Sequence, residues 1–398
     1  MADFFQKVLT DGWEGVYQQD YRISSDNFPG MDGPSWSISK YTLKGGKQHG
    51  VDMVEIDNGR MTVVVVPSRG MNVLEAFTDE ATLGWDSPVK QVVHPAFVDE
   101  ESRGALGWLE GFNELVARCG LAFHGAPGED RVKTNTGAEA TMMLPLHGTI
   151  SNTPALRVAV QVQLEPPHEL SVIGEVYDTQ MFGASYHLHT SISTVPGASE
   201  FAIRDTVENL SACAADMELL YHCNYGPPLL GEGSRLLAPV AFVCPRDARA
   251  QEGMAAWDTY PGPEPGFAEQ CYFLRLHPDK RGQTLVVLTG PGEKLAATIR
   301  YPLQQLPAFT VWKNTGGERD GYVTGLEPGT DYPNSRMFER QQGRVVRLDG
   351  GQRYEAELVL GLVTGATNVA RLRDEVAAIA EGKDCRRRDD PDPEYCPD

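Results

Sequence analysis

The chain has 398 residues and a formal net charge of -20, from 35 Lys and Arg against 55 Asp and Glu. A surface this acidic repels a phosphate backbone, which argues against nucleic acid as a partner. Hydrophobic residues make up 41% and charged residues 23%, which is ordinary globular usage, enough for a large core and inconsistent with wholesale disorder.

The first residues, MADFFQKVLTDGWEG, have neither the basic end nor the apolar stretch of a secretory signal, and no run of eighteen apolar residues follows. The seven cysteines are odd in number and contain no CxxC pair, so they do not form the disulfide framework of a secreted domain. We therefore expect a cytoplasmic protein without a membrane partner. The sequence leaves the oligomeric state open.

Short runs rich in Val, Ile, Thr and Tyr, bounded by Gly, Pro, Asn or Asp, recur along most of the chain. This pattern predicts an all-β, mainly antiparallel fold. Alternation within a run indicates one face toward a core and one wetter face, as for Val158, Val160 and Val162 against Gln161 and Gln163. The predicted strands are 36–43, 61–67, 155–164, 171–177, 185–194, 200–209, 216–225, 284–290, 296–302, 309–314 and 353–363.

Turn residues are spread between these runs and do not gather into a linker, which indicates one large β domain over 36–366 with the segment 1–35 packing on it. A helix is predicted over 367–382, because Thr367 can cap it, Gly382 can end it, and apolar residues recur at helical spacing. The charged, Pro-broken segment 383–398 is expected to be a mobile tail. The apolar stripe of the helix is Val369, Leu372, Val376 and Ile379.

The run MELLYHCNY places His222 and Asn224 on the strand face opposite the more apolar residues. An imidazole can exchange protons near neutral pH, although a histidine alone is more often structural. A further histidine, His147, follows a predicted strand in LPLHGTISN, and SYHLHTSI puts His187 and His189 on its polar face.

Glu327 closes an apolar strand in GYVTGLEPGT, a setting that a solvated surface explains poorly and that suits a general base. Four further residues are candidates for binding. Arg69 can donate to sugar hydroxyls or to a carboxylate, and Trp312 can stack on a sugar ring or lie in the core. The other two are Arg118 and Asn224, of which Asn224 shares a strand face with His222.

Six motifs in consistent order, together spanning about 45–365, resemble the galactose mutarotase-like superfamily and, more narrowly, its DUF4432 branch related to the aldose 1-epimerases. They are VPSRGMNV (66–73), LGWDSP (83–88), RCGLAFHGAP (118–127), LPLHGTISNTPA (144–155), ELLYHCNYGPPLL (218–230) and TGLEPGTDYPN (324–334). The resemblance implies a β-supersandwich with a sugar groove on one sheet.

The resemblance also implies a cofactor-free mutarotase reaction, in which His222 is the general acid, Glu327 the general base and His147 binds the monosaccharide or sugar derivative. The motif HCNYGPP departs from the mutarotase pattern and leaves the reaction open. One alternative is a metal-dependent sugar isomerase or epimerase with His187, His189, His222 and Glu327 around a divalent ion. Another is a carbohydrate-binding protein without catalysis.

Overall fold

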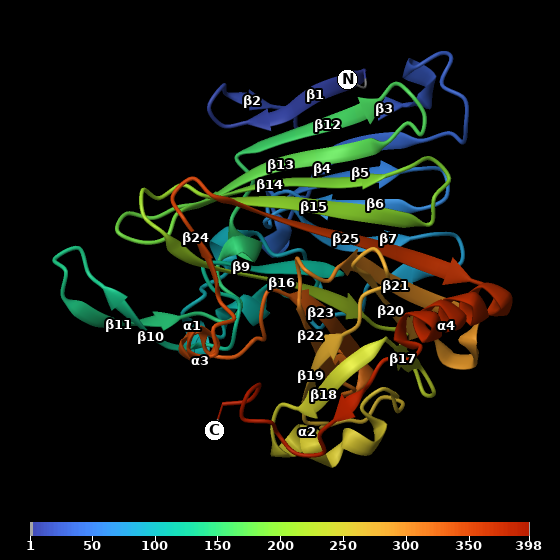
Figure 1. Cartoon of the computed structure of the whole chain (residues 1–398). Coiled ribbons are helices and arrows are strands. Elements are labelled where there is room, and N and C mark those ends of the chain that lie inside the picture. Colours follow the sequence, from blue (N-terminus) through green and yellow to red (C-terminus); the bar gives the residue numbers. More distant parts are fainter. Residues whose placement is uncertain (1–2, 398) are drawn as a thin grey trace.

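Two large β-sheets lie face to face in the computed structural model, which describes residues 3–397 (Figure 1). The ladders between its strands are antiparallel, apart from the short parallel pairing of β18 with β26. The ten-stranded sheet has the spatial order β17 (Arg235–Leu237), β20 (Gln283–Thr289), β21 (Leu295–Pro302), β25 (Arg353–Thr364), β15 (Glu200–Asn209), β14 (Tyr186–Thr194), β13 (Leu170–Asp178), β12 (Arg157–Gln163), β1 (Phe4–Asp11) and β2 (Val16–Tyr17).

The fourteen-stranded sheet carries the candidate active site. Its main path is β26 (Arg386–Arg387), β18 (Val240–Pro245), β19 (Gln270–Leu276), β22 (Ala308–Asn314), β23 (Val323–Gly329), β16 (Ala215–Tyr225), β9 (Val116–Leu121), β7 (Asn72–Phe77), β6 (Thr62–Val66), β5 (Asp52–Asp57), β4 (Ser37–Thr42) and β3 (Tyr21–Ser24). Two short strands join its sides, β24 (Val346–Leu348) on β16 and β8 (Thr82–Leu83) on β7.

The remaining elements are a hairpin and short helices. The hairpin of β10 (Gly128–Lys133) and β11 (Glu139–Leu144) projects from the body at the left of Figure 1. The α-helices of residues 3–397 are α1 (Ser102–Ala105), α2 (Ala248–Glu252), α3 (Arg336–Gln341) and α4 (Ala366–Ala380). None of these helices is long and apolar enough to cross a membrane.

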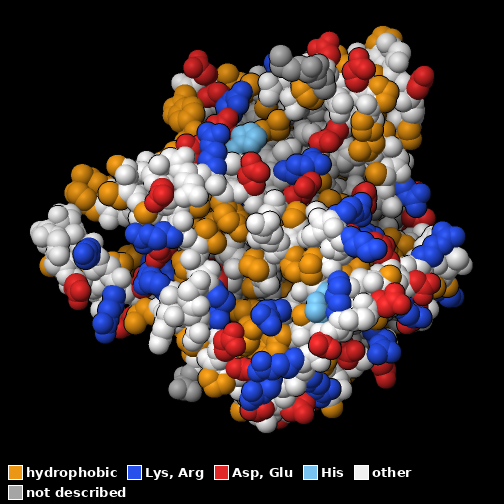
Figure 2. All heavy atoms as spheres, in the orientation of Figure 1, with side chains coloured by type: hydrophobic (Ala, Val, Ile, Leu, Met, Phe, Trp, Pro, Cys, Tyr) orange, Lys and Arg blue, Asp and Glu red, His pale blue; other side chains and the backbone are white. Residues whose placement is uncertain are grey.

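The main core lies between the two sheets, where alternate residues of each strand point inward. Val158, Val160 and Val162 of β12 are at most 1% exposed and belong to the same apolar cluster as Ile56 and Val63 of the other sheet. The predicted alternation is therefore confirmed, and each of the eleven predicted runs overlaps a strand of the structure. Figure 2 shows acidic and basic side chains interspersed over the outer surface on one face.

The N-terminal segment does more than pack on the domain. β1 pairs with β12 in the ten-stranded sheet, and β3 pairs with β4 in the fourteen-stranded sheet. This segment is therefore an integral part of both sheets. Sequence alone did not indicate it, because only Leu9 and Asp11 of β1 are buried and the strand lacks a run of apolar residues.

Helix α4 occupies the predicted place. Its stripe of Val369, Leu372, Val376 and Ile379 is buried in a small cluster with residues of β20 and β21. The helix begins one residue before Thr367, and Gly365 is its N-cap, so the predicted cap residue is wrong by two positions.

The segment after α4 is packed against the body, and the prediction of a mobile tail over 383–398 is wrong for the described residues. β26 adds to the edge of β18, and Tyr395 stacks on Phe242 with ring centroids 4.4 Å apart. Tyr395 and Cys396 are each 4% exposed. The buried ring of Tyr395 and the buried thiol of Cys396 hold this segment in place, although its overall composition is that of a solvated tail.

Candidate active site

The predicted acid and base lie side by side on neighbouring strands. β16 pairs with β23 in the register Cys223 to Leu326, which puts His222 and Glu327 on the same outer face of the sheet. Nε2 of His222 is 3.2 Å from Oε1 of Glu327, and the two residues are 4% and 2% exposed. Within residues 3–397 that oxygen has no hydrogen-bond partner of good geometry, so it remains free to contact a ligand.

Asn224 fixes the protonation of the His222 ring. Its amide NH₂ donates to the carbonyl oxygens of Glu114 and His222, so its Oδ1 must face Nδ1 of His222, at 2.7 Å. That oxygen only accepts, so Nδ1 carries a hydrogen. Nε2, which faces Glu327, is therefore the nitrogen that gains or loses a proton. Asn224 is wholly buried and positions the ring without lining the cavity.

Burial controls the charge of the pair. It lowers the pKa of His222 well below its usual 6.5, and the neighbouring His147 lowers it further. Burial likewise raises the pKa of Glu327 well above its usual 4.5, with Glu269 adding to the effect. A buried pair of this kind favours its uncharged arrangement, with a single proton on the carboxyl group and a neutral imidazole.

Gly325 provides the room that the pair needs. A Cβ at this position would lie 2.3 Å from Oε1 of Glu327 and 2.9 Å from Cε1 of His222. A side chain there would therefore displace the carboxylate. The glycine of GLEPGT is part of the site even though it contributes no functional group.

His147 lies beside the pair, with its ring edge-on to that of His222 and the two centroids 5.4 Å apart. Its backbone has a φ of +60°, and the following Gly148 has +70° with two carbonyl oxygens too close to admit a Cβ. Nδ1 of His147 donates to the carbonyl oxygen of His124 at 2.8 Å. Burial lowers the pKa of His147 to about 4, so at neutral pH its Nε2 is a hydrogen-bond acceptor.

The three residues lie in one cavity of about 280 Å³. Aromatic rings form much of its wall, with Trp312 on β22 and with Trp108 and Phe112 on the segment after α1. Nε1 of Trp108 is buried without a hydrogen-bond partner in the described chain, which leaves a donor available. The other lining residues are Leu106, Leu109, Ala126, Pro127, Leu146, Arg246, Glu269, Cys271, Thr310 and Pro333.

Sequence reasoning missed Trp108, Phe112, Arg246 and Glu269. Arg246 and Glu269 form an ion pair at 3.1 Å, and Glu269 also accepts from Nε1 of Trp312 at 2.7 Å. No local pattern identifies them, because the aromatic wall comes from an irregular loop. The signal that existed was compositional: GALGWLEGFNE is an aromatic, Gly-rich loop within an otherwise β-type chain.

The two predicted binding arginines are not in the cavity. Arg69 and Arg118 are fully buried and are paired with Glu114 at 2.5 Å and Asp205 at 2.6 Å. Arg118 also donates to Thr190 of the facing sheet. Their guanidinium groups connect parts of the fold. Both arginines therefore form structural ion pairs and not the predicted contacts with a substrate.

His187 and His189 are also far from the pair. Their neighbour Leu188 points into the core between the sheets, which places both histidines on the outer face of the ten-stranded sheet. His222 lies on the outer face of the other sheet. Both sheets and the core separate the two groups, so the metal set of His187, His189, His222 and Glu327 is not assembled.

The family described as "Domain of unknown function (DUF4432)" matches residues 48–362. The chain belongs to the DUF4432 family. The predicted resemblance is thereby confirmed.

Solved structures show the fold of this DUF4432 protein. A protein from Klebsiella pneumoniae subsp. pneumoniae MGH 78578, named as a "putative aldose 1-epimerase", is 35% identical with a TM-score of 0.91, over 98% of this chain and 99% of that one. A galactose mutarotase-like protein from Clostridium acetobutylicum is 13% identical with a TM-score of 0.55, over 82% and 98% of the two chains. Among curated proteins, none matches. The fold is the predicted antiparallel β-supersandwich of the galactose mutarotase type.

Proposed function

We propose that this DUF4432 protein is a carbohydrate-active isomerase of the aldose 1-epimerase type, which interconverts the anomers of an aldose or a derivative. The observation that carries the proposal is the contact of His222 with Glu327, at 3.2 Å, inside an aromatic cavity. The name of the Klebsiella relative, whose whole length the chain matches, supports the same reaction class.

In the proposed reaction, Glu327 takes the proton of the anomeric hydroxyl while Nε2 of His222 gives a proton to the ring oxygen. The bond between C1 and the ring oxygen breaks, the bond from C1 to C2 rotates, and the reverse transfers close the other anomer. The reactive form is the charged pair, which is reached when the carboxyl group of Glu327 passes its proton to Nε2 of His222. Ring opening then returns the pair to the uncharged arrangement that burial favours. No step requires a cofactor.

The cavity suits a neutral monosaccharide. Its volume of about 280 Å³ lies just below the usual range of ligand pockets, which is roughly 300–1,000 Å³. Among the described residues of its wall, Arg246 is the one Lys or Arg side chain, and it is already paired with Asp247 and Glu269, which disfavours a phosphorylated sugar. Nε2 of His147 can accept from a sugar hydroxyl and Nε1 of Trp108 can donate to one, while the aromatic faces pack on the ring.

The test is a panel of aldoses assayed for anomer exchange by saturation-transfer NMR against the uncatalysed rate. Glu327→Gln keeps the side-chain shape, and His222→Gln replaces the imidazole by an amide that cannot exchange a proton near neutral pH. Each is expected to lower the catalysed rate about 10²- to 10⁴-fold. Glu165→Gln and His189→Gln are matched controls at surface positions and are expected to keep the parental rate.

A Glu327→Gln variant that exchanged anomers at the parental rate would remove the general base from the proposal. A parent protein that bound a sugar of the panel without accelerating its exchange would be a carbohydrate-binding protein instead.

A further inference from the structure

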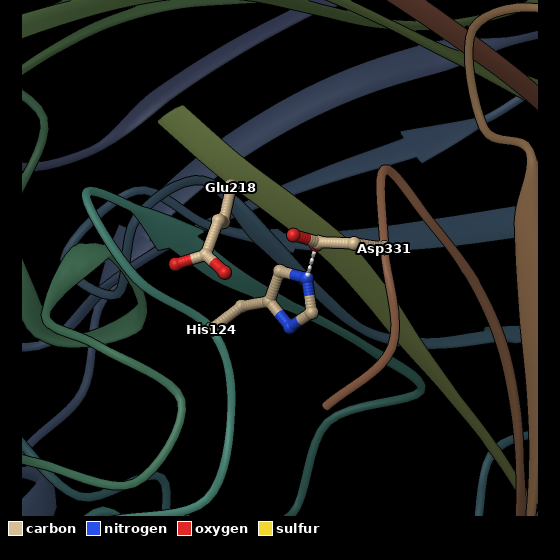
Figure 3. A group of neighbouring side chains, drawn as sticks. All are labelled: His124, Glu218 and Asp331. Atoms are coloured by element: carbon tan, nitrogen blue, oxygen red, sulfur yellow. Dashed lines mark hydrogen bonds and ion pairs between the residues drawn. The ribbon is translucent and has the colours of Figure 1, made fainter. Parts of the chain in front are cut away.

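A second group of buried ionisable side chains lies outside the cavity. His124 follows β9, Glu218 is on β16 and Asp331 follows β23, and they are 0%, 1% and 0% exposed. Figure 3 shows the carboxylates of Glu218 and Asp331 beside the imidazole ring of His124. One nitrogen or oxygen atom of each residue lies within 4.8 Å of the corresponding atoms of the other two.

The group has more acceptors than donors. Nε2 of His124 contacts Oδ1 of Asp331, and the hydroxyl of Thr330 donates to the same oxygen at 3.1 Å. Oε2 of Glu218 and Oδ2 of Asp331 are buried and have no hydrogen-bond partner within residues 3–397. Leaving two carboxylates buried in this way costs several kcal/mol for each charge unless a positive charge accompanies them.

The nearby arginines do not supply that charge. Arg336 is paired with Asp130, and Arg344 with Glu339 at 2.6 Å. These guanidinium groups are engaged by other carboxylates, and Asp130 is shared by Arg336 and Arg340. Glu218 and Asp331 therefore need a bound proton or a further cation to balance their charge.

We propose that His124, Glu218 and Asp331 bind a first-row divalent metal ion, Zn²⁺ or Mn²⁺. One imidazole nitrogen with two carboxylate oxygens is a ligand set for these ions, whereas Ca²⁺ and Mg²⁺ prefer oxygen ligands alone. This set is distinct from the four-residue set predicted from the sequence. The proposal is independent of the proposed sugar chemistry, because binding is read from metal content.

Each ligand is connected to one residue of the candidate active site. Glu218 is on the same face of β16 as His222, and Asp331 lies four residues after Glu327. The carbonyl oxygen of His124 accepts the hydrogen bond from His147. A metal ion at this place would tie together the three segments that carry the site, so its role is structural.

The experiment measures metal in the full chain, purified without a chelator or a polyhistidine tag. Elemental analysis by mass spectrometry is expected to find about one Zn²⁺ or Mn²⁺ per chain. Dialysis against EDTA is expected to remove the ion and to lower the melting temperature, and ZnCl₂ or MnCl₂ is expected to restore both. Glu218→Gln and Asp331→Asn keep the shape of each ligand and are expected to lower the affinity by more than the roughly 10- to 100-fold caused by loss of an outer partner.

Glu175→Gln is the matched control, since it alters a contact with His187 at 3.6 Å on the outer face of the other sheet, and it is expected to keep the ion. If the group instead shares a proton, the parent will contain no stoichiometric metal and neither salt will raise its melting temperature. That result overturns the proposal even if a variant fails to fold, because it is measured on the parent. It is also distinguishable from a failure of the proposed function, since no sugar is used.

Discussion

Replacing Gly325 by alanine tests whether catalysis depends on the space between the paired side chains. The added Cβ would lie 2.3 Å from Oε1 of Glu327, whereas ordinary contacts begin at 3.4 Å. The carboxylate must therefore move by about 1 Å. A displacement of that size costs about 100-fold in rate, which equals about 2.7 kcal/mol of transition-state stabilisation.

The backbone of Gly325 is not in the left-handed region, so alanine is compatible with it. Overpacking is expected to cost about 1–3 kcal/mol of folding stability, and the variant should remain folded. The assay compares anomer exchange by NMR with the unfolding midpoint by circular dichroism. Gly128→Ala on β10 is the control, because the nearest atom to its Cβ is 4.0 Å away. A folded Gly325→Ala protein with the parental exchange rate would refute the reasoning.

Three further predictions concern pH and stability. Catalysis needs one proton on the pair, so kcat/KM should fall in acid, where Nε2 of His222 is protonated while Glu327 keeps its proton, and should fall in alkali, where Glu327 loses its proton. Because burial lowers the pKa of His222, the acid limb of the pH profile should lie below 6.5, and an acid limb centred above 6.5 would contradict this. Arg118→Met should lower the free energy of unfolding by about 3–5 kcal/mol by leaving Asp205 unpaired, and Asp205→Leu added to it should recover much of the loss in urea titrations. Tyr395→Ala should cost roughly 1.5–3 kcal/mol, whereas a mobile tail would show no change in the same titration.

Sequence predicted the parts of the fold that depend on local pattern. The alternating valines of β12 and the apolar stripe of α4 each indicate which face of the element is buried in a core. The periodicity of the apolar residues is enough to identify both elements. The first strand, β1, was missed because only its pairing with β12 makes it a strand. The tail was missed for the same reason, since the cluster that buries Tyr395 comes from a distant part of the chain.

In the candidate site, too, local pattern identified single residues, whereas contacts between distant residues were not predicted. His222 and Glu327 were found because an ionisable residue within an apolar strand is unusual, and a resemblance linked the two. Arg69 was misplaced because its partner Glu114 is 45 residues away, and the sequence does not show that the two meet. His187 was on the polar face of its strand as predicted. The alternation of polar and apolar residues along a strand, however, does not show which sheet the strand joins.

The pairing of β16 with β23 has a consequence for how the protein reaches its working state. Glu327 is synthesised more than a hundred residues after His222, and the intervening strands β17 to β22 are distributed over both sheets. Such contacts between distant parts of a chain form slowly, because a long loop must close before they gain any stability. The contact of His222 with Glu327 should therefore be among the last features to appear during refolding, after the local hairpins have acquired their structure.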